Sequence, residues 1–162
     1  MSWKIILIVF MLFALYIYSY YRSPKNTYII QSHIRMFKPE ILLDKQPIII
    51  DDNDYDILTL KSTFMSINPS HNFILTGQDT WCKNKYKYLM IQSKIGPCDI
   101  LLCNPNSVNT STNTPVESDA TEIVEAQLSE NQILIVPFNW IYLVNSQVDC
   151  IGVHDFITYF LP

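Results

Sequence analysis

Residues 128–144 read Leu-Ser-Glu-Asn-Gln-Ile-Leu-Ile-Val-Pro-Phe-Asn-Trp-Ile-Tyr-Leu-Val, and this stretch decides the fold class. It contains two runs rich in β-branched and aromatic residues, Ile133–Val136 and Trp140–Val144, on either side of Pro-Phe-Asn. Short runs of this composition, bounded by turn residues, are typical of strands in a sheet. The stretch therefore predicts strands on both sides of a short connection.

Working outward, the same kind of run recurs along most of the chain. Strands are expected at 47–51, 73–75, 86–93, 100–102, 123–128 and 148–156. A Gly96-Pro97 turn predicts that the strands at 86–93 and 100–102 form a hairpin. The polar residues 104–118 are expected to form a surface loop. Many short strands separated by turns favour a β-sandwich or barrel.

Two short helices are expected among these strands. Ile30, Ile34 and Phe37 recur at helical spacing, which predicts a short amphipathic helix over 28–37. A helical turn is expected around Leu58–Ile67. The fold class is therefore mainly β, with one or two short helices.

The N-terminal residues form an apolar segment. Residues 5–18 read IILIVFMLFALYIY and contain no charge, glycine or proline. With its continuation to Tyr21, the segment supplies about 17 residues and about 25 Å of helix. A bilayer's hydrocarbon core is about 30 Å thick, so a thin membrane fits best, such as the endoplasmic reticulum or a viral inner membrane. The segment predicts a single-pass anchor over 1–22, in the bilayer through residues 5–21, followed by one domain over 23–162.

A cleaved signal peptide is the alternative reading of this segment. Cleavage requires small residues after the apolar run, whereas here Tyr-Ser-Tyr-Tyr-Arg follows it. An uncleaved anchor is therefore expected. Lys4 and the amino terminus balance Arg22 and Lys25, so the positive-inside rule leaves the orientation open. The sequon at Asn109 matters only if the domain is lumenal.

Composition limits the partners. The net charge is −4, with 11 basic and 15 acidic residues, and the basic residues form no stripe. A phosphate backbone would not be held electrostatically, so nucleic acid is not an expected partner. The abundance of Ile and Asn, and of Lys over Arg, is typical of AT-rich genomes such as those of large DNA viruses or protists.

No residue pattern predicts a metal site. The four cysteines have no zinc-finger spacing and are expected to be free thiols, with a Cys98–Cys103 disulfide as the alternative in an oxidising compartment. The acidic run 51–56 fails as an EF-hand, because Ile57 and Thr63 stand where glycine and glutamate are needed. The histidines at 33, 71 and 154 lie in three separate segments.

Two segments carry a family resemblance. Residues 88–105 contain a strand, a glycine turn, a strand and a proline. Residues 128–144 contain a strand followed by Pro137 and Trp140. Together with the opening Lys45-Gln-Pro47-Ile-Ile-Ile, they resemble cupin-like domains related to the JmjC oxygenases, over most of residues 28–162. The resemblance implies a double-stranded β-helix, or jelly roll.

The resemblance also implies where an active member would hold Fe(II), with an HxD pair on one strand and a histidine on a later one. Cys82 stands here at the first histidine, Asn84 at the aspartate and Tyr142 at the second histidine. Pro97 or Cys98 falls at the lysine that pairs with 2-oxoglutarate. No HxD or HxE occurs in the domain. We therefore expect no catalytic residues, no metal and no cofactor.

These observations favour a membrane-anchored, non-catalytic cupin-like module, a pseudoenzyme that binds another protein or serves as a structural component. A large DNA virus particle or its membrane is one context for it. The alternatives are a metal-free cupin that binds a small ligand among Asn84, Tyr86 and Tyr142, and a 2-oxoglutarate/Fe(II) oxygenase. The sequence leaves the partner and the oligomeric state open.

Overall fold

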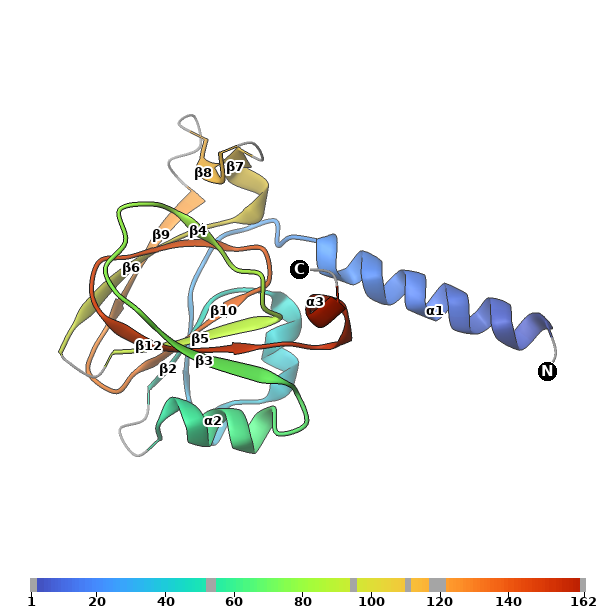
Figure 1. Ribbon diagram of the computed structural model, residues 1–162, viewed down its shortest axis with the longest axis horizontal. Helices are drawn as coiled ribbons and strands as arrows, with labels where there is room; N and C mark the ends of the chain where they lie inside the picture. The colour runs from blue at the N-terminus through green and yellow to red at the C-terminus, as the bar shows by residue number, and fades with distance from the viewer. Residues whose placement is uncertain (1–2, 52–54, 94–95, 110–111, 117–121, 161–162) are drawn as a thin grey trace.

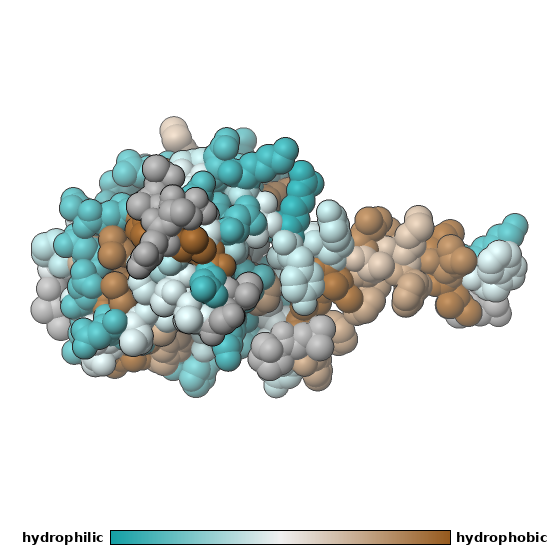
Figure 2. All heavy atoms as spheres, turned by 90° about the horizontal axis from the view of Figure 1, so that it is seen from above, coloured by the Kyte–Doolittle hydropathy of each residue, from teal (hydrophilic) through white to brown (hydrophobic). Residues whose placement is uncertain are grey.

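A computed structural model describes residues 3–51, 55–93, 96–109, 112–116 and 122–160. The apolar segment forms helix α1, Trp3–Tyr21, which projects from a body built mainly of strands (Figure 1). No residue of α1 is buried, and the helix is long and apolar enough to cross a membrane. Figure 2 shows this apolar helix extending from a body whose visible surface is largely hydrophilic.

The larger sheet has six strands. Its order is β1 (Ile30–His33), β2 (Ile48–Asp51), β10 (Ile133–Pro137), β5 (Tyr88–Gln92), β12 (Val148–Val153) and β3 (Ser70–Leu75). β1 and β2 pair in parallel, and every other neighbouring pair in the sheet is antiparallel. The strands expected at 133–136 and 47–51 are thus confirmed as β10 and β2.

The smaller sheet has four antiparallel strands. Its order is β4 (Cys82–Lys83), β11 (Ile141–Val144), β6 (Cys98–Cys103) and β9 (Ile123–Leu128). From β3 to β6 and again from β9 to β12, successive strands alternate between the two sheets. A separate short pair consists of β7 (Val108–Asn109) and β8 (Thr114–Pro115).

One hydrophobic cluster fills the space between the two sheets. It draws Leu89 and Ile91 from β5, Leu102 from β6 and Trp140 from the start of β11. Trp140 is completely buried, as are most residues of this cluster. The interior of the domain is therefore formed by side chains from both sheets.

A second cluster covers the outer face of the six-stranded sheet. Helix α2 (Ile57–Phe64) and the 3-10 turns η1 (Ile34–Met36) and η2 (Pro39–Asp44) pack there against residues such as Met90. The helical turn expected around residues 58–67 is thus confirmed. Because this sheet is covered on both faces, β5 is almost continuously apolar rather than alternating.

The acidic run before α2 has a structural role at its last residue. Asp56 is the N-cap of α2, and its side chain accepts a hydrogen bond of 2.7 Å from the backbone amide of Thr59. A carboxylate here satisfies an amide that the helix leaves unpaired. Residues 52–54 lie outside the described part of the chain.

The helix expected over 28–37 is wrong. Residues 30–33 form strand β1, and only the short turn η1 follows. Ile30 pairs with Ile48 of β2, and its amide donates to the Pro47 carbonyl oxygen at 2.9 Å. The parallel partner strand satisfies the backbone that a helix would have bonded internally, so tertiary pairing overrides the helical spacing.

The hairpin expected at Gly96-Pro97 is also wrong. β5 pairs with β10 and β12, whereas β6 pairs with β11 and β9 in the other sheet. Gly96 adopts a φ of 90°, a conformation that glycine reaches without strain. The turn therefore carries the chain from one sheet to the other, because both sheets need a strand to close over the shared interior.

Two further expectations need correction. The region 104–118 is not wholly a surface loop: Asn104 and Ser107 are buried, and β7 and β8 lie within it. The strand expected to run to residue 156 ends at Val153, and a short helix, α3 (Phe156–Phe160), follows. Asp155 accepts hydrogen bonds from the amide and hydroxyl of Thr158, which favours helix over strand there.

Gly152 of β12 gives a test of the interior packing. A Cβ at this position would lie 2.3 Å from the ring of Tyr86, which itself stacks on Phe73. We expect Gly152→Ala to lower the free energy of unfolding by about 1–3 kcal/mol through overpacking. Urea denaturation of the full chain in detergent measures it.

The double variant supplies the control. In a Tyr86→Ala background the ring is gone, so Gly152→Ala should cost much less there than in the wild type. An equal cost in the two backgrounds would contradict the packing of the Tyr86 ring against β12.

Candidate functional site

The three positions predicted to correspond to iron ligands of cupin-like oxygenases lie near one another at the joined ends of β4 and β11. Cys82 of β4 and Tyr142 of β11 are directly paired residues, and Asn84 follows β4 by one residue. The expected juxtaposition is therefore present. The three side chains make different contacts there.

The side chain of Asn84 forms hydrogen bonds with backbone groups. Its side-chain nitrogen donates to the carbonyl oxygens of Val136 and Pro137 at 2.9 and 2.8 Å, and its side-chain oxygen accepts from the amide of Tyr86 at 2.9 Å. The residue is 1% exposed. Since both amide hydrogens and the oxygen are used, the side chain joins the end of β10 to the chain that enters β5.

Cys82 and Tyr142 face the interior cluster. The Cys82 thiol donates to Gln78 Oε1 at 3.0 Å, and Tyr142 is 6% exposed. Burial raises the pKa of Cys82, and burial together with Cys82, Cys150 and Tyr86 raises the pKa of Tyr142 well above its usual value. Both groups stay protonated near neutral pH, which disfavours them as metal ligands.

Tyr86 belongs to an aromatic row rather than to an open pocket wall. Its ring stacks on Phe73 with centroids 5.7 Å apart and meets the His154 ring edge-on at 4.8 Å. The His154 ring in turn meets the ring of Tyr159 in α3, with centroids 5.9 Å apart. The row connects the interior of the domain to the C-terminal helix.

The remaining candidate ligands are dispersed. Among the described residues, no group of three His, Cys, Asp or Glu side chains is placed to hold a metal ion. All four cysteines are free thiols. Cys98 and Cys103 stand at the two ends of β6, about 16 Å apart at 3.3 Å per residue, so a disulfide between them is excluded.

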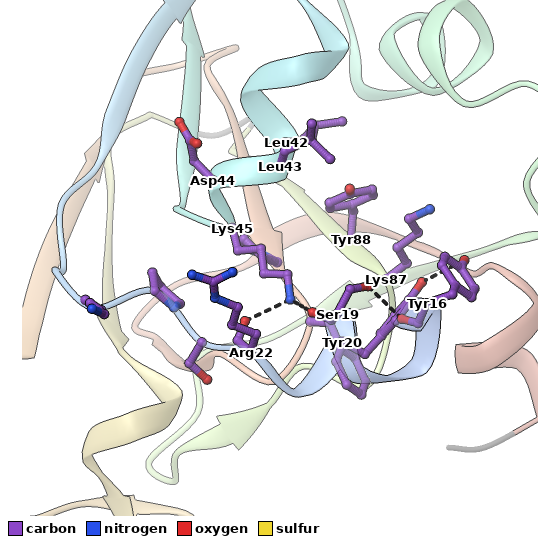
Figure 3. A pocket seen from close by; sticks show the side chains of 15 residues that line it. Tyr16, Ser19, Tyr20, Arg22, Leu42, Leu43, Asp44, Lys45, Lys87 and Tyr88 are labelled. Atoms are coloured by element: carbon purple, nitrogen blue, oxygen red, sulfur yellow. Dashed lines mark hydrogen bonds between the residues drawn. The ribbon is translucent and has the colours of Figure 1, made fainter. Parts of the chain in front are cut away.

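A cavity of about 540 Å³ lies elsewhere, at the foot of α1 (Figure 3). The last turns of α1 form one side of it, through residues such as Tyr16 and Tyr20. The end of η2 and the start of β5 contribute Lys45 and Lys87, and the linker after α1 contributes Arg22. Residues far apart in sequence make this cavity, so sequence reasoning missed it; the cations that follow the apolar segment were its only signal.

Lys45 joins the cavity to the core. Its backbone has a φ of 54°, and its carbonyl oxygen accepts a 3.0 Å hydrogen bond from the Trp140 indole. Its ammonium donates to the carbonyl oxygens of Ser19 and Arg22, the latter at 2.8 Å. These carbonyls belong to the C-terminal end of α1, where a cation satisfies unpaired acceptors and the negative end of the helix dipole.

Asp155 forms a second junction between α1 and the domain. Its carboxylate accepts a hydrogen bond from Tyr16 Oη at 2.5 Å and lies 3.5 Å from the Lys87 ammonium. Nearby, Phe13 contacts Phe156 of α3 with ring centroids 6.5 Å apart. The same carboxylate caps α3, so one residue positions both the C-terminal helix and the anchor.

The linker between α1 and β1 is fixed by polar side chains. Asn104 and Asn106 donate to the Pro24 carbonyl oxygen at 3.1 and 3.0 Å, and Gln46 donates to the Asn26 carbonyl oxygen at 2.6 Å. Asn104 and Gln46 are buried. The anchor is thus joined to the domain through a bonded connection.

No family model matches the chain, and no curated protein matches it. The cupin-like resemblance therefore stays a prediction that rests on the residues quoted above.

Asn84 gives a sharp test of this site, because the family's metal-binding members carry aspartate there. Asn84→Asp should lower the free energy of unfolding at pH 7 by about 2–5 kcal/mol, since one oxygen of the buried carboxylate would face the carbonyl oxygens of Val136 and Pro137 in place of a donor. An unfolded Asp ionises at about pH 4, and the buried one only at higher pH, so the loss should shrink toward pH 4.

Asn145→Asp is the matched control, because Asn145 is exposed. Its free energy of unfolding should stay within about 0.5 kcal/mol of the wild type. A comparable loss in the two variants would contradict the structural role of the Asn84 amide.

Proposed function

We propose that this chain is a single-pass membrane protein whose α1 anchors a non-catalytic jelly-roll domain, and that the domain acts by binding another protein. One observation carries the proposal: the positions that would form a catalytic centre are occupied by packed or bonded side chains, while the apolar helix α1 has no buried residue. Such a module would serve as an interaction or structural component of a membrane, or of a virus particle that contains one.

The strand order supports the jelly-roll assignment. A jelly roll has eight strands in two facing sheets, with neighbours along the chain crossing between the sheets. Here β3, β12, β5 and β10 are neighbours in one sheet, and β4, β11, β6 and β9 are neighbours in the other. β1 and β2 extend the first sheet beyond these eight strands. The positions of Cys82 and Tyr142 on paired strands agree with the cupin-like resemblance.

The interior favours a packed scaffold over a small-ligand site. A ligand-binding member would need an open, partly polar cavity lined by Asn84, Tyr86 and Tyr142. The donors and the acceptor of the Asn84 side chain all bond to the backbone, and the Tyr86 ring occupies the space over Gly152. The oxygenase alternative predicts stoichiometric Fe(II) and 2-oxoglutarate turnover in the purified full chain, either of which would overturn the proposal.

The contacts of α1 support a domain seated directly on the bilayer. The domain touches α1 from Phe13 onward, so residues 3–12 extend freely for about 15 Å, half a hydrocarbon core. Beside Phe13, α3 exposes Phe156, Tyr159 and Phe160 at 58–64%. Aromatic residues of this kind partition into the headgroup boundary. With α3 embedded there, residues 3–12 enter the hydrocarbon core and the last turns of α1 lie in the headgroup region.

The edge of the larger sheet at β3 is an argument for a protein as the partner. β3 is the last strand of its sheet, pairing only with β12 in the described part of the chain. A groove of about 250 Å³ runs beside it, between β3 and α2, and exposes Leu58 and Ile74 at 54% and 60%. An unpaired edge beside apolar side chains suits an extended segment that adds as a further strand.

The anchor is tested by placing charge in α1. Ile8→Arg with Leu12→Arg adds about 5–7 kcal/mol to the cost of crossing the bilayer. After an alkaline carbonate wash of membranes, the wild-type chain should stay in the pellet with an intact mass that includes residues 1–22, and the double variant should be released.

Met36→Arg with Ile67→Arg is the matched control, since both residues are more than 70% exposed on the domain. This variant should stay in the pellet. Release of the wild type, or a mass that lacks the apolar segment, would contradict the anchor.

The partner surface is tested by Ile74→Arg, which places a charge in the groove beside β3. We compare the proteins that cross-link to the full chain in membranes for wild type, Ile74→Arg and Ile67→Arg. A partner that uses the β3 edge should be lost in Ile74→Arg and kept in Ile67→Arg, because Ile67 is 94% exposed outside the groove. Equal cross-linking by all three would contradict this surface.

A further inference from the structure

The cavity at the foot of α1 concentrates positive charge on a chain that is acidic as a whole. Four basic residues line it, Arg22, Lys25, Lys45 and Lys87, against one acidic residue, Asp44. The full chain carries 11 basic and 15 acidic residues. The charge balance is thus inverted at this one place, directly where the anchor meets the domain.

Two of these basic groups, Arg22 and Lys45, act on each other, whereas the Lys87 ammonium is paired with the Asp155 carboxylate at 3.5 Å. Figure 3 shows the Arg22 guanidinium beside the Lys45 ammonium, with the Asp44 carboxylate pointing away from both. Burial and the nearby Arg22 lower the pKa of Lys45. Two cations held this close repel each other, and an anion between them would relieve the repulsion.

The backbone holds this arrangement in place without a ligand. Trp140 bonds the Lys45 carbonyl oxygen, and the ammonium is bonded to the carbonyl oxygens of Ser19 and Arg22. The linker that carries Arg22 and Lys25 is bonded to the domain at Pro24. A site that is already ordered loses little conformational entropy when it binds.

Aromatic and aliphatic side chains form much of the remaining wall, beside the last turns of α1. Tyr20 and Phe138 meet edge-on with centroids 5.4 Å apart, and Leu42 and Tyr88 line the same cavity. The cavity flanks the α1 segment from Tyr16 to its end, which is where an anchor helix leaves the hydrocarbon core. Cations above an apolar wall at this level match a phosphate group attached to a glycerol and acyl chains.

We propose that this cavity binds the phosphate-bearing headgroup of an anionic phospholipid from the bilayer in which α1 is inserted. The inference rests on the proposed membrane anchor. It assigns the cavity a lipid rather than a soluble ligand, because the only apolar solvent beside it is the membrane. The bound lipid would fix the domain against the surface.

The test uses the full chain reconstituted in phosphatidylcholine vesicles that contain spin-labelled phosphatidylserine or spin-labelled phosphatidylcholine. Electron paramagnetic resonance measures the fraction of each label that is immobilised by the protein. We expect phosphatidylserine to be preferred about fivefold to tenfold. Arg22→Gln with Lys25→Gln should reduce the preference to about twofold or less.

Lys61→Gln with Lys83→Gln is the matched control, because it removes the same charge from residues that do not line the cavity. The preference should survive in this variant. Equal loss in both double variants, or no preference in the wild type, would overturn the proposal.

Two further outcomes separate the sources of failure. If millimolar inorganic phosphate released the immobilised phosphatidylserine, the cavity would be a soluble-anion site and the lipid assignment would be wrong. If the wild-type chain failed to stay with vesicles of any composition, the anchor itself would be wrong. A chain that stays in the vesicles without lipid preference refutes the cavity proposal alone.

Discussion

The hydrogen bond from the Trp140 indole to the Lys45 carbonyl oxygen, at 3.0 Å, ties the anchor to the core. Trp140 is completely buried between the sheets, and Lys45 stands at the surface beside the last turn of α1. The bond supports the left-handed backbone at Lys45, which directs its ammonium to the end carbonyls of α1. Packing in the interior thereby decides where the helix leaves the domain.

The interior holds polar side chains without leaving them unpaired. Burying an unpaired polar or charged group is costly. The Asn84 amide avoids this cost because its donors and acceptor all bond to the backbone. Tyr142 and Cys82 enter the apolar cluster as protonated groups. All three now contribute to packing and strand connection.

The joint between helix and domain combines three kinds of interaction. Lys45 satisfies the C-terminal carbonyls of α1, Asp155 accepts from Tyr16 while capping α3, and buried amides such as Asn104 hold the linker. Each bond is modest alone, but together they restrict the angle between anchor and domain. The apolar face of α3 and the basic cavity both lie beside α1, at the same end of the molecule. The edge of β3 lies away from this joint, because none of its residues lines the cavity.

Local sequence determined those helices and strands whose composition favours a single backbone conformation. The apolar run became α1 because its backbone bonds close within the segment, and β2, β10 and β11 formed where β-branched residues meet turn residues. Tertiary structure decided the rest. Residues 30–33 became a strand because β2 offers a parallel edge, and the chain crosses between sheets at Gly96 because both edges of β5 are paired with β10 and β12. The cavity at α1 required residues 16–25, 45 and 87 to meet, and no local pattern encodes contacts between segments so distant along the chain.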